Sequence, residues 1–281
     1  MEEAASEDVQ SALAAATAQG NIDEVRRLAR QMLAANGSKA KPQKSPPRPA
    51  PDAKKVAAVE TAAQAATTSS HESKQNTSEL FGLTLSREHV MGEAIWPAAL
   101  CLCRWLEGEG AKPLRVLELG AGGGAPGLLA AALGSSSVVL TDGDAGLLPL
   151  LQRNLALNRQ RISCDVHVYR LDWRSSESVR ECCSLAPSTD EPGFDTILAA
   201  DVLFSVGDIV PMARAVTALL RKHADASLLF AHSCFFDELS HTLLAVMEDA
   251  GLKLTRTSRS QEANVLEFRW SSPCEKASPP S

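Results

Sequence analysis

Short apolar runs alternate with longer segments of helical periodicity over residues 115–250. The runs have the length and composition of buried strands, and the segments between them repeat apolar residues at the spacing of an α-helix. The predicted strands are Arg115–Leu119, Ser137–Thr141, Asp165–Leu171, Asp195–Ala200 and Ala226–Ala231. The predicted helices are Pro126–Leu133, Leu147–Asn158, Ile209–Lys222 and Phe235–Ala250. This alternation indicates a parallel sheet with helices on both faces.

Two further apolar runs, Leu252–Thr257 and Val265–Trp270, follow the last predicted helix. The connection between them is too short for the crossover that parallel neighbours need, so we expect the final strand to be antiparallel. The patterns together predict an α/β fold with a Rossmann-like, doubly wound sheet of seven strands. The sheet is mostly parallel and ends in the antiparallel strand.

The residues before this body divide into two regions. Apolar positions recur at helical spacing on both sides of Gln19-Gly20-Asn21, which predicts a helical hairpin over residues 1–38, similar to one ankyrin-type helix pair. Two interpretations of the hairpin stay open: a structural element without its own activity, or a module that docks a partner. Residues 39–78 are rich in Pro, Ala, Lys, Ser and Thr and predict a flexible linker. The main domain is then 79–272, followed by a disordered tail at 273–281.

Composition narrows the function. The 281 residues carry a formal net charge of −6, and residues 79–281 contain 18 Lys or Arg against 25 Asp or Glu. An acidic body is a poor nucleic-acid binder, because that affinity comes largely from Lys and Arg on phosphates. It suits a cationic cofactor or a basic, lysine-presenting protein substrate. No apolar stretch approaches the ~20 residues of a membrane helix, so we expect no membrane span.

The seven cysteines are scattered and include no C-x-x-C pair, so neither a disulfide framework nor a zinc site is indicated. We therefore expect no metal. Cys182 and Cys183 fall in a segment that the pattern predicts to be a polar loop. The acidic N-terminus is typical of neither a signal peptide nor a basic transit peptide. These features favour a reduced compartment, the cytoplasm or also the nucleus.

A glycine-rich loop follows the first predicted strand of the body, with Gly120, Ala121, Gly122 and Gly124 in the order of the dinucleotide fingerprint. Glycines there allow positive φ and a close approach of a ligand to the backbone. The loop alone permits NAD or another nucleoside cofactor. Glu118, just before the loop, is unsuited to a pyrophosphate and suited to an ammonium or sulfonium, which favours a cationic cofactor.

Acidic and aromatic residues end the next predicted strands, where open α/β sheets bind ligands. Asp142 is placed to accept hydrogen bonds from a ribose, the alternative being a helix cap. Asp172 and Trp173 are placed to bind and stack on adenine, the alternative being a Trp that packs a loop. Asp201 is placed to bind the group that is modified, with Phe204 as one wall, and the alternative for Asp201 is capping of a turn.

These residues resemble a family, the seven-β-strand methyltransferases of family 16, the protein-lysine methyltransferase group. The resemblance covers about residues 80–272. The motifs that carry it are Trp96-Pro97-Ala98-Ala99-Leu100, Glu118-Leu119-Gly120-Ala121-Gly122 with Pro126-Gly127, Thr141-Asp142 followed by Asn154 and Asn158, and Leu171-Asp172-Trp173 with Ala200-Asp201-Val202-Leu203-Phe204. The last motif matches the family's D-x-x-(Y/F) signature and is the most specific of the four.

The resemblance implies S-adenosylmethionine as cofactor. The residues that it implies for cofactor binding are Gly120, Gly122 and Gly124 at the ribose and methionine portions, Asp142 at the ribose, Trp173 at the adenine, Ala200 through its backbone, and Trp96 closing over the cofactor. Trp96 has an alternative in core packing beside Leu100 and Cys103. Phe204 stands where the family usually has Tyr, so a phenol hydrogen bond is lost and only shape and cation–π attraction remain.

We therefore expect transfer of a methyl group to a protein nitrogen, most simply that of lysine. Asp201 would capture and orient the incoming ammonium. A protein histidine or arginine methyltransferase of the same fold and a non-catalytic cofactor-binding scaffold stay open. An NAD-linked oxidoreductase is disfavoured by Glu118, by the antiparallel last strand and by the lack of a Tyr-x-x-x-Lys pair. His232 is expected to be a structural polar residue rather than a base, and no particular substrate is indicated.

Overall fold

The computed structural model describes residues 2–34, 77–86, 95–109, 114–186, 191–233 and 237–271. The first two elements are the helices α1, Glu2–Ala18, and α2, Ile22–Ala34. They confirm the predicted hairpin around Gly20, which has a φ of 64°. The predicted linker 39–78, apart from its last two residues, and the tail 273–281 lie outside the described residues.

A seven-stranded sheet in the order β5-β4-β3-β6-β7-β9-β8 forms the centre of the body. Its strands are β3 Arg115–Leu119, β4 Ser137–Asp142, β5 Asp165–Arg170, β6 Thr196–Ala200, β7 Ser227–Ser233, β8 Leu252–Arg259 and β9 Ala263–Trp270. Neighbouring strands from β5 to β7 pair in parallel. β9 is antiparallel to both β7 and β8. The predicted fold class and the antiparallel last strand are therefore confirmed.

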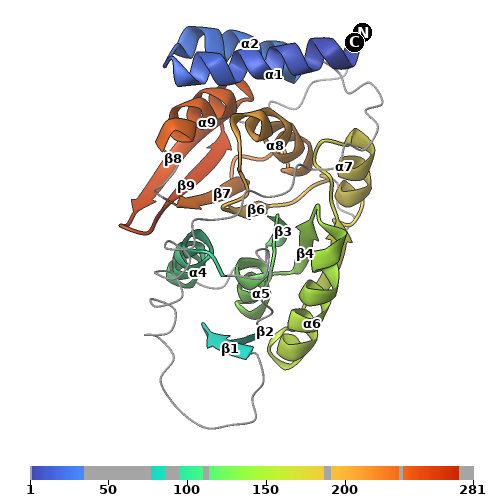
Figure 1. Cartoon of the computed structure of the whole chain (residues 1–281). Coiled ribbons are helices and arrows are strands. Elements are labelled where there is room, and N and C mark those ends of the chain that lie inside the picture. Colours follow the sequence, from blue (N-terminus) through green and yellow to red (C-terminus); the bar gives the residue numbers. More distant parts are fainter. Residues whose placement is uncertain are drawn as a thin grey trace, which may run out of the picture.

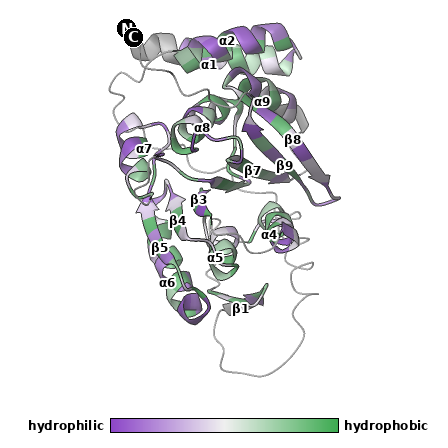
Figure 2. Cartoon of the chain, turned by 180° about the vertical axis from the view of Figure 1, so that it is seen from behind, coloured by the Kyte–Doolittle hydropathy of each residue, from purple (hydrophilic) through white to green (hydrophobic). Residues whose placement is uncertain are grey.

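Helices cover both faces of this sheet (Figure 1). α4 (Pro97–Glu109), α5 (Ala125–Ala132) and α6 (Leu148–Asn158) contribute to the apolar core on one face. α7 (Ser176–Cys183), α8 (Val206–Leu219) and α9 (Asp237–Asp249) lie on the other. β8 is at the edge of the sheet; seven of its eight residues are exposed, and its colour in Figure 2 is mainly hydrophilic. No helix among the described residues is long and apolar enough to cross a membrane.

The N-terminal hairpin forms a third layer on α8 and α9 (Figure 1). Leu13, Val25 and Leu28 are at most 3% exposed and belong to the same apolar core as those helices. Salt bridges from Arg26 and Arg30 to Asp249, at the end of α9, surround this contact. The hairpin thus buries its apolar face on the main body, which gives it a structural role; docking of a partner stays a prediction.

The structure also contains elements that were not predicted. A small hairpin of β1 (Thr77–Leu80) and β2 (Leu83–Ser86) precedes α4, so regular structure begins two residues before the predicted boundary at 79. The segment with Cys182 and Cys183 is the helix α7, not a polar loop. Its helix begins because the Ser175 side chain accepts the N–H of Ser178. Cys182 is fully buried, which raises the pKa of its thiol to about 12.

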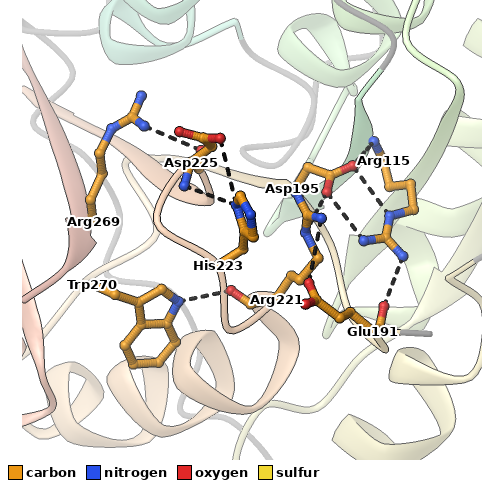
Figure 3. Close-up of polar contacts among 8 residues, drawn as sticks. All are labelled: Arg115, Glu191, Asp195, Arg221, His223, Asp225, Arg269 and Trp270. Atoms are coloured by element: carbon orange, nitrogen blue, oxygen red, sulfur yellow. Dashed lines mark hydrogen bonds and ion pairs between the residues drawn. The ribbon is translucent and has the colours of Figure 1, made fainter. Parts of the chain in front are cut away.

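A buried ionic cluster ties the amino ends of β3 and β6 together (Figure 3). The Arg115 guanidinium donates to both carboxylate oxygens of Asp195, at 3.1 and 3.2 Å, and the Arg115 N–H donates to the same group at 2.8 Å. Arg221, which follows α8, approaches Asp195 within 2.8 Å. This edge lies opposite the carboxyl ends of the strands, so the cluster holds the sheet together away from the predicted site.

Candidate active site

The strand order places the predicted site residues in a row along the carboxyl edge of the sheet. Trp173 follows β5, Asp142 ends β4, the glycine loop follows β3, and Asp201 follows β6. Neighbouring strands lie about 4.8 Å apart, so this row of four strands spans about 14 Å. That is long enough for an extended nucleoside with an amino-acid tail.

The glycine loop is a tight turn between β3 and α5. Gly120, Gly122 and Gly124 have φ values of 58°, 54° and 78°, which confirms the expected positive φ. A Cβ atom at Gly120 would lie 2.8 Å from Cγ1 of Val202, the residue after Asp201. The loop is anchored because the Ala121 N–H donates to the carbonyl of Thr141 at 2.8 Å. The loop therefore packs directly against the turn that carries Asp201.

The Asp142 carboxylate lies beneath this loop and is 2% exposed. One oxygen accepts the N–H of Gly122 at 3.0 Å and the other accepts the N–H of Asp144 at 2.9 Å. Asp144, not Asp142, caps the following short helix by accepting the N–H of Gly146. Asp142 therefore does not cap this helix, which was the alternative to ribose binding. Ribose binding by Asp142 stays a prediction.

Glu118 points into the core rather than to the surface. Its carboxyl group is 2% exposed and accepts the N–H of Gly127, in the first turn of α5, at 3.0 Å. Burial raises the pKa of Glu118 to about 8, and the nearby Asp142 carboxylate adds to this effect. Glu118 thus fixes the start of α5, while its expected contact with a cationic cofactor stays a prediction.

Asp172 and Trp173 leave the sheet after β5, which ends at Arg170, one residue earlier than predicted. The Asp172 carboxylate accepts the N–H of Arg174 at 2.9 Å, which forms a local turn. Trp173 is half-buried at the margin of the core, so part of its ring surface is open. Arg174 pairs with Asp208, which caps α8 through a capping box with Ser205. This pair joins the loop after β5 to the loop after β6.

Asp201 has a left-handed backbone with a φ of 51°, which is uncommon outside glycine. Burial raises the pKa of its carboxyl group, while hydrogen bonds from Ser233 and the Ala98 amide at the start of α4 act in the opposite direction. The side chain does not cap α8, because Ser205 and Asp208 perform that function, but it accepts the Ala98 N–H in the first turn of α4. Phe204, three residues on, is 39% exposed. An exposed aromatic ring can attract a cation through its face.

The remaining predicted residues lie at the same edge. Ala200 is the last residue of β6 and is half-buried. The next residue, Asp201, donates its N–H to the carbonyl of Ala231 in β7. Trp96 directly precedes α4 and is half-buried. His232 is 7% exposed and its Nδ1 lies 3.2 Å from the carbonyl oxygen of Ser233, so it is a buried polar residue as expected. His89 lies outside the described residues.

Sequence reasoning missed two residues that organise this edge, Ser233 and Asp208. Ser233 donates two hydrogen bonds to Asp201. Asp208 accepts the backbone N–H groups of Phe204 and Ser205. The capping box of Ser205 and Asp208 could have been predicted, because a serine followed three residues later by a carboxylate is a known signal for a helix start. Nothing in the sequence distinguishes Ser233 from other serines at strand ends.

The donor set fits an S-adenosyl cofactor. An aromatic face, a buried carboxylate and a loop of positive-φ glycines follow one another along the edge, which matches the adenine, the ribose and the methionine portion in that order. Trp173, Asp142 and the glycine loop would hold these parts, and Asp201 follows on the next strand, where a substrate amine would bind. Among the described residues, no three His, Cys, Asp or Glu side chains are grouped to hold a metal ion.

The fold and the site define the class, the S-adenosylmethionine-dependent methyltransferases. A putative enzyme of this class from Streptococcus mutans has a TM-score of 0.53 at 12% identity, over 72% of this chain and 57% of that one. TYW2 of Pyrococcus horikoshii, solved with MeSAdo, has a TM-score of 0.50 at 18% identity, over 70% and 71%. These two likenesses support the fold.

The chain belongs to the lysine methyltransferase family, whose model matches residues 77–267. The protein N-lysine methyltransferase METTL21A of Danio rerio is 37% identical over 115 residues, 39% of this chain and 47% of that protein. The protein N-terminal and lysine N-methyltransferase efm7 of Neurospora crassa is 25% identical over 193 residues, 64% of this chain and 67% of that one. The chain thus spans about half of METTL21A and two thirds of efm7, and the resemblance to family 16 is confirmed.

Proposed function

We propose that this protein transfers a methyl group from S-adenosylmethionine to the side-chain amine of a lysine in a protein substrate. The observation that carries the proposal is the Asp201 carboxylate, held by Ser233 at the carboxyl edge of β6 in a turn that packs against the glycine loop and that leads to the exposed Phe204. Family membership and the names of the two protein-lysine methyltransferases above support it.

When bound, the cofactor supplies a methyl group that its attachment to a sulfonium activates for transfer. The protein's tasks are then to position the amine and to exclude water. A lysine amine has a reference pKa near 10.4, so only about 0.04% is neutral at pH 7. The substrate nitrogen must therefore lose a proton in the site before it can act as a nucleophile.

Asp201 serves the first of these tasks. A carboxylate attracts and orients a protonated amine, but it also raises the pKa of that amine, so it does not by itself favour proton loss. The exposed face of Phe204 offers a second, weaker attraction to the same cation. Release of the proton to water is favoured as the amine is desolvated against this ring and approaches a second positive charge.

Two alternatives to lysine methylation are compatible with the same fold, and experiments distinguish them. A histidine or arginine nucleophile would use the same edge, and mapping of the modified residue separates it from lysine. A non-catalytic scaffold would bind the cofactor without turnover. The acidic body of 18 basic against 25 acidic residues over 79–281 favours a substrate with a basic surface around the modified residue.

Methyl-labelled S-adenosylmethionine added to a cell lysate with the purified protein tests the proposal. The wild type is compared with Asp201→Asn, because Asn also tolerates the left-handed backbone and removes only the charge. Loss of a charge-assisted contact predicts about a ten- to hundredfold lower rate. A matched control is Asp165→Asn, an exposed aspartate at the start of β5 on the opposite edge of the sheet.

Samples are divided for protease and nuclease treatment, and the labelled band is digested for mass spectrometry. Label in discrete protease-sensitive bands, on lysine, retained by Asp165→Asn and reduced by Asp201→Asn, supports the proposal. Nuclease-sensitive label or label on another residue type rejects lysine as the acceptor. Cofactor binding by calorimetry without any label favours the scaffold.

A further inference from the structure

Ser233, the last residue of β7, makes both of its polar hydrogens available to one carboxylate. Its backbone N–H donates to Oδ1 of Asp201 at 2.7 Å, and its hydroxyl donates to Oδ2 at 2.6 Å. The serine is 3% exposed, so these bonds are shielded from water. Two donors from one residue on two different oxygens fix the plane of the carboxylate, because rotation about its Cβ–Cγ bond would break one of them.

The backbone of Asp201 is held in the same way. Its N–H donates to the carbonyl of Ala231 at 2.9 Å, which continues the pairing of β6 with β7 past the last strand residue. Its φ of 51° turns the side chain out of the regular strand path. The side chain thus points to Ser233 because the neighbouring strand, and not the helix that follows, holds it.

The groups around this carboxylate leave it able to receive a cation. An ionised carboxylate has about four acceptor sites; Ser233 uses two of them and the Ala98 amide uses a third. The charged or titratable group that faces it from β7 is His232, whose ring is buried; α4 contributes the Ala98 amide. No Lys or Arg among the described residues forms an ion pair with Asp201, so a substrate amine has no internal competitor there.

We propose that Ser233 is a positioning residue, which holds the Asp201 carboxylate in the one orientation that presents its remaining acceptor site to the substrate amine. The inference rests on the proposed function, since it assigns Ser233 a role in lysine capture by Asp201. Ser233 contacts neither the substrate nor the cofactor in this role. It acts through the carboxylate.

Ser233→Ala removes the hydroxyl bond and keeps the backbone bond, so the carboxylate can rotate. We expect kcat/KM for the labelled substrate protein to fall about tenfold, mostly in kcat, because orientation is lost. S-adenosylmethionine affinity, measured by calorimetry, should stay within about twofold, because the lost bond lies outside the cofactor site. Removal of a donor also raises the pKa of Asp201, so the acidic limb of the kcat/KM–pH profile should move to higher pH.

Two comparisons separate positioning from simple damage to the fold. Ser233→Thr keeps the hydroxyl and should restore both the rate and the pH profile. Ser227→Ala removes a buried hydroxyl six residues earlier on the same strand and on the same face, which donates to no carboxylate in the described part of the chain, and should change neither. Thermal unfolding of each variant verifies that it is folded.

The outcomes are distinct. A wild-type rate and pH profile in Ser233→Ala overturn the inference and leave the proposed function intact. Equal losses in Ser233→Ala and Ser233→Thr, with both variants folded and binding the cofactor, also overturn it, because the hydroxyl would then not be the active feature. If the wild type itself labels no protein, the proposed function fails and the inference fails with it.

Discussion

Replacement of Glu118 by Gln tests whether a neutral carboxyl group is buried beneath the glycine loop. The side chain is 2% exposed and accepts a 3.0 Å hydrogen bond from the Gly127 N–H. Burial raises the pKa of this carboxyl from 4.5 to about 8. The folded protein therefore holds a proton that the unfolded chain releases at neutral pH.

The direction in which the free energy of unfolding changes with pH follows from proton linkage. A native state that binds more protons than the unfolded state loses stability as pH rises, here from about pH 4.5, the pKa of the unfolded chain, to about pH 8, with no further change above it. Each pKa unit corresponds to about 1.4 kcal/mol, so the cost of Glu118 is about 1 kcal/mol at pH 5.5, about 3 at pH 7 and about 5 at pH 9. Glutamine keeps an oxygen for the Gly127 N–H and has no proton to lose.

Urea unfolding at these three pH values provides the measurement. The free energy of unfolding of Glu118→Gln should exceed that of the wild type by a margin that grows by about 3–4 kcal/mol from pH 5.5 to pH 9. Groups that titrate equally in both proteins cancel in this difference. The exposed control Asp165→Asn should differ from the wild type by a margin independent of pH. A pH-independent margin for Glu118→Gln would refute the reasoning, because Glu118 would then ionise normally in the folded state.

Three further predictions concern packing and the buried ions, each measured by urea unfolding. Gly120→Ala should destabilise the protein by about 1–3 kcal/mol and weaken cofactor binding in calorimetry, whereas Gly108→Ala, with open space around it in a helix, should be neutral or stabilising by up to about 1 kcal/mol. Leu13→Ala should cost about 2–5 kcal/mol because its side chain is fully buried. Arg30→Ala should cost under about 1 kcal/mol, because the arginine is exposed and Asp249 keeps its ion pair with Arg26. Asp195→Asn should cost about 3–5 kcal/mol because it removes the negative charge that the buried Arg115 guanidinium faces, and a loss below about 1 kcal/mol would contradict this.

The sheet could be predicted because its parallel strands are buried on both faces and therefore appear as uninterrupted apolar runs. β3 has the predicted bounds, Arg115–Leu119, and all five of its residues are buried. The positions of Asp142 and Asp201 followed from the same reasoning, since strand ends set the ligand edge. The small β1–β2 hairpin could not be predicted in this way, because strands of four residues are too short to show a period.

The orientation of the Glu118 side chain could not be predicted from the hydrophobic pattern either. Alternation of apolar and polar residues indicates which face a strand residue occupies, but a strand that is covered on both sides gives no such signal. The carboxyl group is directed by a partner nine residues away, the N–H of Gly127 in the next helix. Ser233 is 32 residues from the carboxylate that it holds, and such distant pairs depend on the assembled sheet rather than on local sequence.

Two motifs that look independent in the sequence prove to be one packed unit. A side chain at Gly120 would strike Val202, so the first glycine of the loop is required by the turn that carries Asp201 as well as by its own φ of 58°. The shape of that turn depends on the left-handed backbone of Asp201, which directs the carboxylate to Ser233. A substitution in either motif therefore displaces the other. The glycine loop and the D-x-x-F motif should consequently show non-additive effects on stability and turnover when they are mutated together, as contacting residues do.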